Sequence, residues 1–375
     1  MIRRLYSRRI SSLLISISGY FGALSGYMSV TSHNPSSPTE YLIKVNFGGI
    51  MEGESVSMFS GGIPASVLKT IAVVTMFIDH FAFMVVKLLE ERFLPEWGAK
   101  GPVSTPLRMV GRMAFVIYAY LLAEGLIYTR NRGRYLLRLL LGAVISEIPF
   151  DLAVSGKVID LWEQNTFFTL SIGFSVIWVL DEIKRTYERT YGLPPGNAQI
   201  QNDIKTGKVR DMQKDNGVGS GFTAFGILVI AAGLILAELI RCDYGCMGVG
   251  LIVTFYLCRW KWYLFPAALI ENYFGHLLVD LIAAEVKLYR YCLKWDKPFH
   301  LMSMQNLWIN LKNFASERMI YTMPGIVAAL LLILRYNGEK GKQLPKAFYY
   351  LFYPAHLLAL NGAAWVVMRI IRYLF

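Results

Sequence analysis

The stretch LKTIAVVTMFIDHFAFMVV, residues 68–86, decides the fold class. It is apolar over the roughly 20 residues that a helix needs to cross the hydrocarbon core of a bilayer. Asp79 and His80 stand side by side within it. An ionisable side chain inside a membrane span is costly, so such residues mark a functional site by default. The stretch therefore predicts a membrane helix that carries part of a polar site.

The composition of the whole chain agrees with a membrane protein. Of its 375 residues, 55% are hydrophobic and 17% are charged, whereas soluble domains have about 45–50% apolar and about 25% charged residues. The alternating ten-residue strands of an outer-membrane barrel are not found. We therefore predict an all-α membrane protein, a polytopic helical bundle of about nine transmembrane helices in the lipid bilayer.

The predicted spans follow apolar runs of helical length. They cover roughly residues 67–87, 107–128, 135–154, 166–180, 222–240, 245–258, 262–284, 319–334 and 347–371. Residues 63–375 are predicted to form this transmembrane domain, interrupted by a polar cytoplasmic insert at 181–219. Residues 1–62 form a basic and then semi-apolar segment with a linker. This segment could be a signal sequence, a weak span or a peripheral helix, and we favour one that is removed or does not span.

Basic residues predict the orientation. Four of them surround the turn after the second predicted span: Arg130, Arg132, Arg134 and Arg138. Such turns face the cytoplasm, and counting onward places the loop around Lys340 on the same side. The loop 285–318 then falls outside, where NLWINLKNF is predicted to be an interfacial helix. The formal net charge of +12 thus reflects loops that face anionic lipid, and no nucleic-acid module is found. We place the chain in the inner, cytoplasmic membrane as a multi-pass protein.

Polar residues of several predicted spans are expected to share one depth in the membrane. The candidates are Asp79, His80, Arg108, Arg112, Glu147, Asp151, Gln164, Asn165, Asp243, Tyr244, His276, Tyr353 and His356. Most of them fall in the middle or outer half of the bilayer, as expected for the lining of a shared cavity. Burial favours the neutral imidazole that a general base requires, so His80 is the sharpest candidate.

Structural alternatives stay open for these residues. Arg108 and Arg112 are four residues apart on one helix face, as are Glu147 and Asp151 on the next helix, so the two pairs could form salt bridges. A lone histidine on an apolar helix is often a packing residue. No metal site is predicted, because the four cysteines contain no CxxC pair. They are Cys242, Cys246, Cys258 and Cys292.

Six blocks of the sequence, in order, resemble the TraX family of integral-membrane proteins. They are VLKTIAVVTMFIDH, LRMVGRMAFVIYAYLLAEG, YLLRLLLGAVISEIPFDLA, QNTFFTL, DYGCMGV and FYPAHLLAL. The resemblance runs from about residue 66 to residue 371 and leaves out residues 1–62 and the insert at 181–219.

The resemblance implies an activity. The namesake of the family is implicated in N-terminal acetylation of conjugative pilin, and relatives resemble membrane acyltransferases that draw acyl-CoA from the cytoplasm. It implies that this chain transfers an acetyl or similar group from acetyl-CoA to an unknown acceptor amine or hydroxyl. Such enzymes place a His, or an Asn or Asp, on an early membrane helix, and Asp79 and His80 match that position.

On this interpretation His80 deprotonates the acceptor, and Asp79 or His356 positions it. Arg108 or Arg112 stabilises the developing oxyanion or holds a CoA phosphate. The remaining candidates are assigned to substrate or cofactor binding: Glu147, Asp151, Gln164, Asn165, Asp243, Tyr244, His276 and Tyr353.

Two other classes of protein are alternatives to an acyltransferase. A secondary transporter would bury similar groups along a proton or substrate path, and a non-catalytic assembly factor would need no such cluster.

Overall fold

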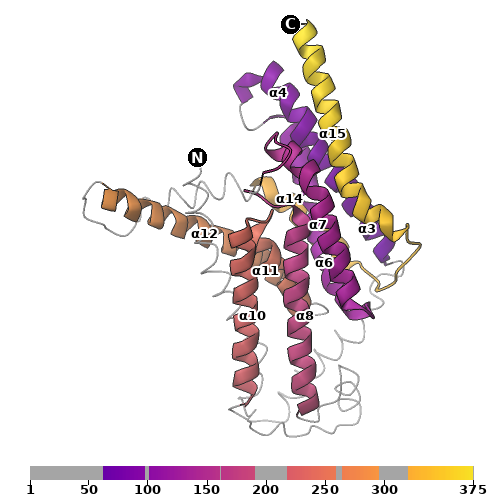
Figure 1. Cartoon of the computed structure of the whole chain (residues 1–375), viewed down its shortest axis with the longest axis vertical. Coiled ribbons are helices and arrows are strands. Elements are labelled where there is room, and N and C mark those ends of the chain that lie inside the picture. The colour runs from indigo at the N-terminus through magenta and orange to yellow at the C-terminus, as the bar shows by residue number, and fades with distance from the viewer. Residues whose placement is uncertain are drawn as a thin grey trace, which may run out of the picture.

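Helices dominate the computed structural model, which describes residues 62–97, 101–160, 162–190, 218–258, 264–294 and 320–374 (Figure 1). In chain order they are α3 (Ala65–Phe81), the π-helix η2 (Ala82–Val86), α4 (Lys87–Phe93), the 3-10 helix η3 (Pro95–Trp97), α5 (Ser104–Gly111), α6 (Met113–Tyr128), α7 (Arg132–Val154), α8 (Thr166–Thr190), α10 (Val218–Ile240), α11 (Gly245–Cys258), α12 (Leu264–Lys294), α14 (Ile320–Leu334) and α15 (Lys346–Leu374). The predicted all-α membrane fold is confirmed.

The part of the chain that the structure describes does not confirm the predicted nine membrane spans. Within the described residues, five helical segments are long and apolar enough to cross a membrane: Ala65–Phe93, Ser104–Tyr128, Thr166–Thr190, Thr223–Ile240 and Ala347–Leu374. Helices α11 and α14 are apolar but shorter. Helix α7 contains Arg138, Glu147 and Asp151, yet its exposed side chains include an apolar set: Leu137, Leu140, Leu141, Val144, Ile145 and Ile148. The count of nine is therefore not established.

The stretch at residues 68–86 is helical throughout, as predicted. Its final part changes from α-helix to the π-helix η2, which begins two residues after His80. Single π-helical turns are rare and are frequently found at functional sites. The backbone irregularity therefore coincides with the two ionisable residues of this span.

The second predicted span is broken at Arg112, which lies between α5 and α6. Helix α5 packs against α3 at Gly111, where a Cβ atom would overlap the Asp79 side chain. It also packs against α14 at Gly325, where a Cβ atom would overlap the Met109 carbonyl oxygen. Small residues allow this close approach of membrane helices. The break and the two glycines together bring Arg108 and Arg112 beside α3.

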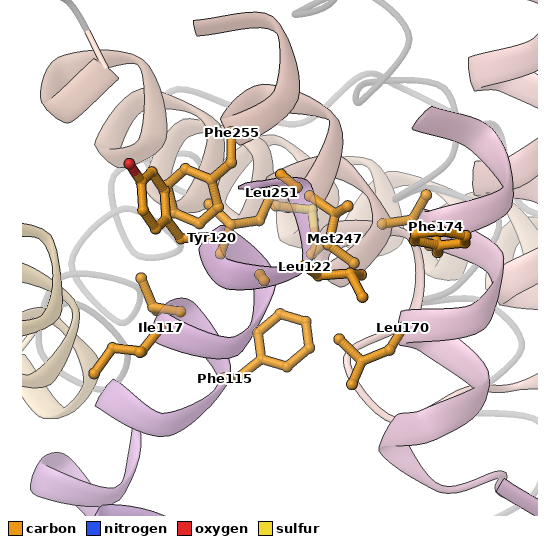
Figure 2. Packing of buried hydrophobic residues seen from close by; sticks show 14 of the residues in the cluster. Phe115, Ile117, Tyr120, Leu122, Leu170, Phe174, Met247, Leu251 and Phe255 are labelled. Carbon is orange, nitrogen blue, oxygen red and sulfur yellow. The ribbon is translucent and has the colours of Figure 1, made fainter. Parts of the chain in front are cut away.

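The core is centred on α11, which is apolar all round and buried along nearly its whole length. A helix with this pattern must be covered by other helices, and α6, α8, α10 and α12 pack around it. Figure 2 shows the centre of this packing, where Phe115 and Leu122 of α6 lie near Leu170 of α8 and Met247 of α11. Because α11 is enclosed by protein, its 14 residues need not match the thickness of a bilayer.

Several loops gather at one end of the molecule, which we call the basic end. Here the start of α3 bonds to the loop 335–345, since the Ala65 and Ser66 amides donate to the Glu339 and Lys340 carbonyls at 2.8 and 3.0 Å. Arg132, after the α6–α7 turn, bonds to the C-terminal half of α8. Tyr336 at the start of that loop and Tyr128 at the end of α6 are within electrostatic range of each other, so the loop 335–345 and the α6–α7 turn lie on the same side of the molecule. Helix α4 and the end of α15 lie at the opposite end (Figure 1).

Two helices continue past the predicted limits of their membrane spans. Helix α8 continues to Thr190, ten residues past the expected end of its span, so the start of the insert at 181–219 is helical. Helix α12 continues to Lys294 instead of ending near residue 284. Ion pairs one helical turn apart support the polar end of α8, including Arg185 with Asp181 at 2.8 Å. Residues 1–61, the rest of the insert and NLWINLKNF lie outside the described residues.

Candidate functional site

The centre of the candidate site is a pair of histidines from two helices. His80 near the end of α3 and His356 in α15 place Nδ1 and Nε2 2.6 Å apart. Their rings are nearly parallel, with centroids 4.9 Å apart. The side chain of Tyr353 meets both rings edge-on at 5.8 Å. The structure thus joins two residues that are 276 positions apart in the sequence.

The hydrogen bonds of the pair determine which nitrogen atoms carry protons. His356 Nδ1 lies 2.6 Å from the Phe352 carbonyl oxygen, which can only accept, so Nδ1 must donate. In the neutral ring Nε2 then accepts, and it accepts the Nδ1–H of His80. The remaining nitrogen of neutral His80, Nε2, therefore has a free lone pair, and it bonds to no residue that the structure describes. A nitrogen in this state can act as a general base.

Cationic groups from α5 and the α5–α6 junction lie beside the histidine pair. The Arg108 Nε atom is 3.5 Å from Asp79 Oδ1 in a partly buried ion pair. The guanidinium of Arg108 also lies over the Phe83 ring, 5.0 Å from its centroid. Both Arg108 and Arg112 are within electrostatic range of His80. His80 therefore lies near two guanidinium groups, one of which is paired with Asp79.

A second acidic group completes this cluster. Asp243, in the α10–α11 turn, accepts a hydrogen bond from Thr166 Oγ1 at 2.6 Å and another from the Tyr244 amide at 3.1 Å. Arg112 hydrogen-bonds the Tyr244 side chain and is within electrostatic range of Asp243. The Tyr244 ring stacks on Phe115 with centroids 3.8 Å apart. We call the eight connected residues the polar site: Asp79, His80, Arg108, Arg112, Asp243, Tyr244, Tyr353 and His356.

The backbone adds a favourable field at the same place. Helices α8 and α11 both begin here, at Thr166 and Gly245. The N-terminus of a helix carries a partial positive charge. Two such ends near Asp243 favour negative charge at this place.

Three of the predicted residues, Glu147, Asp151 and Asn165, bond outside the polar site, and a fourth, Gln164, reaches it through its backbone. Asn165 bonds Glu147 and, at 2.8 Å, the Ala143 carbonyl oxygen. Asp151 accepts from the Asp160 amide at 2.7 Å. Gln164 forms a backbone bridge to the α10–α11 turn. These bonds hold the loop between α7 and α8 in place, so the residues have structural partners of their own.

The predicted salt bridges between the two arginines and the two acids of α7 are wrong. Arg108 pairs with Asp79, whereas Glu147 and Asp151 bond to the loop that follows α7. Spacing on a helix identifies a shared face but not the helix that packs against it. His276 lies in α12, and its side chain is outside the described residues.

Sequence reasoning missed three residues that shape the polar site. Thr166 bonds Asp243, Phe83 covers Arg108, and Gly111 makes room for Asp79. Thr166 follows the predicted pair Gln164–Asn165, and Gly111 lies between the two predicted arginines, so their positions in the sequence offered a signal. Phe83 offered none, because it is one of many aromatic residues in an apolar run.

An open hollow of about 300 Å³ lies between η2, α4, α7 and α15, on the side away from the basic end. Its lining includes Phe83, whose ring contacts Arg108, together with Lys87, Glu91 and Asn361. A small molecule or a chain end in this hollow would be separated from the polar site by the Phe83 ring. Among the described residues, no three His, Cys, Asp or Glu side chains gather where they could hold a metal ion.

These features define a class, a multi-pass α-helical membrane protein with a polar site buried between its helices. Residues 65–364 match the TraX protein family, and the chain belongs to this family. The chain is also similar to a probable fimbrial assembly protein, FimC of serogroup H1, from Dichelobacter nodosus. The two are 29% identical over 119 residues, which cover 30% of this chain and 44% of that protein. No solved structure matches the chain.

Proposed function

We propose that this chain is an integral-membrane acyltransferase that moves an acyl group, most simply acetyl, from cytoplasmic acyl-CoA to an acceptor amine or hydroxyl. The observation that carries the proposal is the free Nε2 of His80, which is fixed by His356 and flanked by two arginines. A transfer of this kind needs a base for the acceptor and cations for the acyl oxygen. The polar site contains both.

The transfer would proceed as follows. His80 Nε2 takes the proton of the acceptor N–H or O–H, and the acceptor atom forms a bond to the acyl carbon. The carbon–sulfur bond of the thioester breaks, and the departing thiolate takes the proton from His80. Arg108 and Arg112 offset the negative charge on the acyl oxygen. Atoms and charge balance, and His80 returns to its starting form.

The residues present fit an acyl donor of this type. Acyl-CoA supplies the activated thioester. The Nε atom of Arg108 is buried and makes no hydrogen bond to the described residues, because 3.5 Å to Asp79 is long for one. That unsatisfied N–H is available to an acyl oxygen. The hollow beside Phe83 offers a docking place for the acceptor on the side away from the basic end, and the Phe83 ring would have to turn aside to admit it to the polar site.

The test is acyl transfer by the purified full chain in proteoliposomes, with radiolabelled acetyl-CoA. The acceptors would be a peptide with a free N-terminus, an amino sugar and an ethanolamine lipid. We expect His80→Gln to lower the rate by about 100- to 10,000-fold. The matched control is His300→Gln, which changes a histidine that the sequence places in a loop. Equal rates for wild type and His80→Gln would show the proposal to be wrong.

A second candidate is a non-catalytic role in assembling a fibre subunit, which is favoured by the name of the Dichelobacter nodosus relative. In that case the polar site would hold a partner or stabilise the fold. Copurification with a single membrane partner, unchanged by His80→Gln and without acyl transfer, would support this role over the enzyme.

A further inference from the structure

A second hollow, of about 470 Å³, opens at the basic end. It lies between the α6–α7 turn and the C-terminal half of α8, and we call it the arginine hollow. It is lined by Thr129, Arg130, Asn131, Arg132, Gly133, Trp178, Glu182 and Arg185. Its volume falls within the range of sites for small molecules, and three of its eight lining residues are arginines.

The arginines of the hollow differ in how far they are already neutralised. Arg132 uses both terminal nitrogens, which donate to Asp181 at 2.5 Å and to Glu182 at 2.8 Å. Arg185 uses its Nε atom, which donates to Asp181 at 2.8 Å. Arg130 is exposed and makes no ion pair with any residue in the described part of the chain. The hollow therefore keeps an excess of positive charge, with the guanidinium of Arg130 free to bind.

Two further features suit a ligand with both a phosphate and an aromatic ring. Helix α7 begins at Arg132, and its first two residues, Arg132 and Gly133, line the same hollow, whereas the Arg134 amide is already capped by Asn131. Trp178 is half-buried and offers a ring on which a base can stack. Arginine forks bind phosphate oxygens in pairs. A sugar or a simple organic acid would use only part of this set.

A row of mostly polar side chains, which we call the polar row, connects the region of the hollow to the histidine pair. Tyr135, in the first turn of α7, contacts Arg138 at 5.8 Å, and Arg138 hydrogen-bonds Tyr350 of α15. The ring of Phe167 then links Tyr350 at 6.3 Å to Tyr353 at 5.4 Å. Tyr353 touches both histidines. Helix α6 separates the hollow from Arg112 by 16 residues, or about 24 Å at 1.5 Å per residue.

We propose that the arginine hollow binds the phosphate-bearing adenine nucleotide of the acyl-CoA donor, with Arg130 on the phosphates and Trp178 under the adenine. This assignment rests on the proposed function. It places the donor's nucleotide at the basic end, while its flexible arm would follow the polar row inward to the thioester site at His80. The acceptor would approach from the opposite hollow.

The experiment uses the full chain in detergent and two probes. Binding of adenosine 3′,5′-bisphosphate, which lacks the thioester arm, is measured by calorimetry, and acetyl-CoA kinetics are measured in the transfer assay. We expect Arg130→Gln to weaken bisphosphate binding, and to raise the KM for acetyl-CoA, at least about tenfold with kcat unchanged. Arg130 makes no ion pair within the described part of the chain, so this variant should fold normally. Lys342→Gln, exposed on another loop of the basic end, is the matched control.

A second variant distinguishes the contribution of the Trp178 ring from that of phosphate binding by Arg130. Trp178→Leu should weaken binding of the bisphosphate but not of inorganic pyrophosphate, whereas Arg130→Gln should weaken both. If both ligands bind equally well to wild type and Arg130→Gln, the assignment is wrong. It is also wrong if anionic phosphatidylglycerol vesicles bind through Arg130 while the bisphosphate does not bind, because the hollow then holds a lipid headgroup.

The outcomes distinguish this inference from the proposed function. If acyl transfer depends on His80 but the KM for acetyl-CoA is unaffected by Arg130→Gln, the nucleotide site in the arginine hollow is wrong and the acyltransferase proposal stands. Bisphosphate binding that depends on Arg130, with no acyl transfer, would leave a nucleotide site in a protein of another function.

Discussion

Both ring nitrogens of His356 are bonded within the protein, one to His80 and one to the Phe352 carbonyl. These two bonds determine the tautomer of His80, the proposed general base. The Nδ1–H of His356 is held by the Phe352 carbonyl, so its Nε2 can only accept from His80 in the neutral pair. In the proposed transfer, His356 would therefore be a positioning residue. It keeps the free lone pair of His80 on Nε2 instead of Nδ1.

A pair of substitutions at His356 tests this role. His356→Leu removes the acceptor, so His80 can turn or change tautomer, and kcat should fall about 100-fold. His356→Gln places an amide oxygen near the position of Nε2 and should recover most of the rate. Both variants should unfold at similar temperatures in detergent. If the Gln variant is as slow as the Leu variant while equally stable, the hydrogen bond to His80 has no part in the reaction.

At the scale of elements, the approach of α5 to α3 positions the arginines, and glycine is required there. A Cβ atom at Gly111 would overlap the Asp79 side chain. Gly111→Ala should therefore separate the two helices, with a cost of about 1–3 kcal/mol, and slow transfer by moving Arg108. The control is Gly362→Ala in α15, where a Cβ atom meets nothing within 4 Å. The unfolding temperature in detergent and the transfer rate are measured for both variants. Equal losses in Gly111→Ala and Gly362→Ala would contradict the close contact between α5 and α3.

Asn165 illustrates a structural role for a residue that the sequence assigned to ligand binding. It is fully buried, its side-chain oxygen accepts from the Phe167 amide at 3.0 Å at the start of α8, and its amide nitrogen donates to Glu147. Asn165→Ala should lower the free energy of unfolding by about 1–3 kcal/mol, because Glu147 loses its partner. Asn131→Ala, which removes the exposed cap of α7, should cost about 1 kcal/mol. Thermal unfolding in detergent measures both, and a smaller loss at Asn165 would contradict this role.

The sequence predicted the helices better than their limits and partners. Apolar runs of helical length locate most of the elements, because burial in lipid or core follows composition. The end of α8 was missed because its charged residues resemble a loop, although pairs such as Lys184 and Glu188 support a helix. The partner of Arg108 was missed because periodicity defines a face and not a neighbour. The contact between His80 and His356 depends on how distant helices pack, which no local pattern encodes.

At the scale of the whole molecule, the polar site lies between two openings of different character. The arginine hollow at the basic end carries a net positive charge, whereas the hollow beside Phe83 is mostly apolar, with one lysine, one glutamate and one asparagine. Two substrates that enter from opposite sides of a membrane would need two separate openings of this kind. The arrangement therefore depends on the basic end facing the cytoplasm, where acyl-CoA is found.

Cysteine labelling tests this orientation directly. The four native cysteines are free and buried, so a membrane-impermeant maleimide should label the wild type weakly. Lys340→Cys marks the basic end, and Glu96→Cys marks the opposite end in η3; both positions are exposed. Because basic loops are retained in the cytoplasm, right-side-out vesicles should label only the Glu96→Cys variant and inside-out vesicles only the Lys340→Cys variant. Labelling of both variants from one side would contradict a membrane between the two ends, and the reversed pattern would place the arginine hollow out of reach of cytoplasmic acyl-CoA.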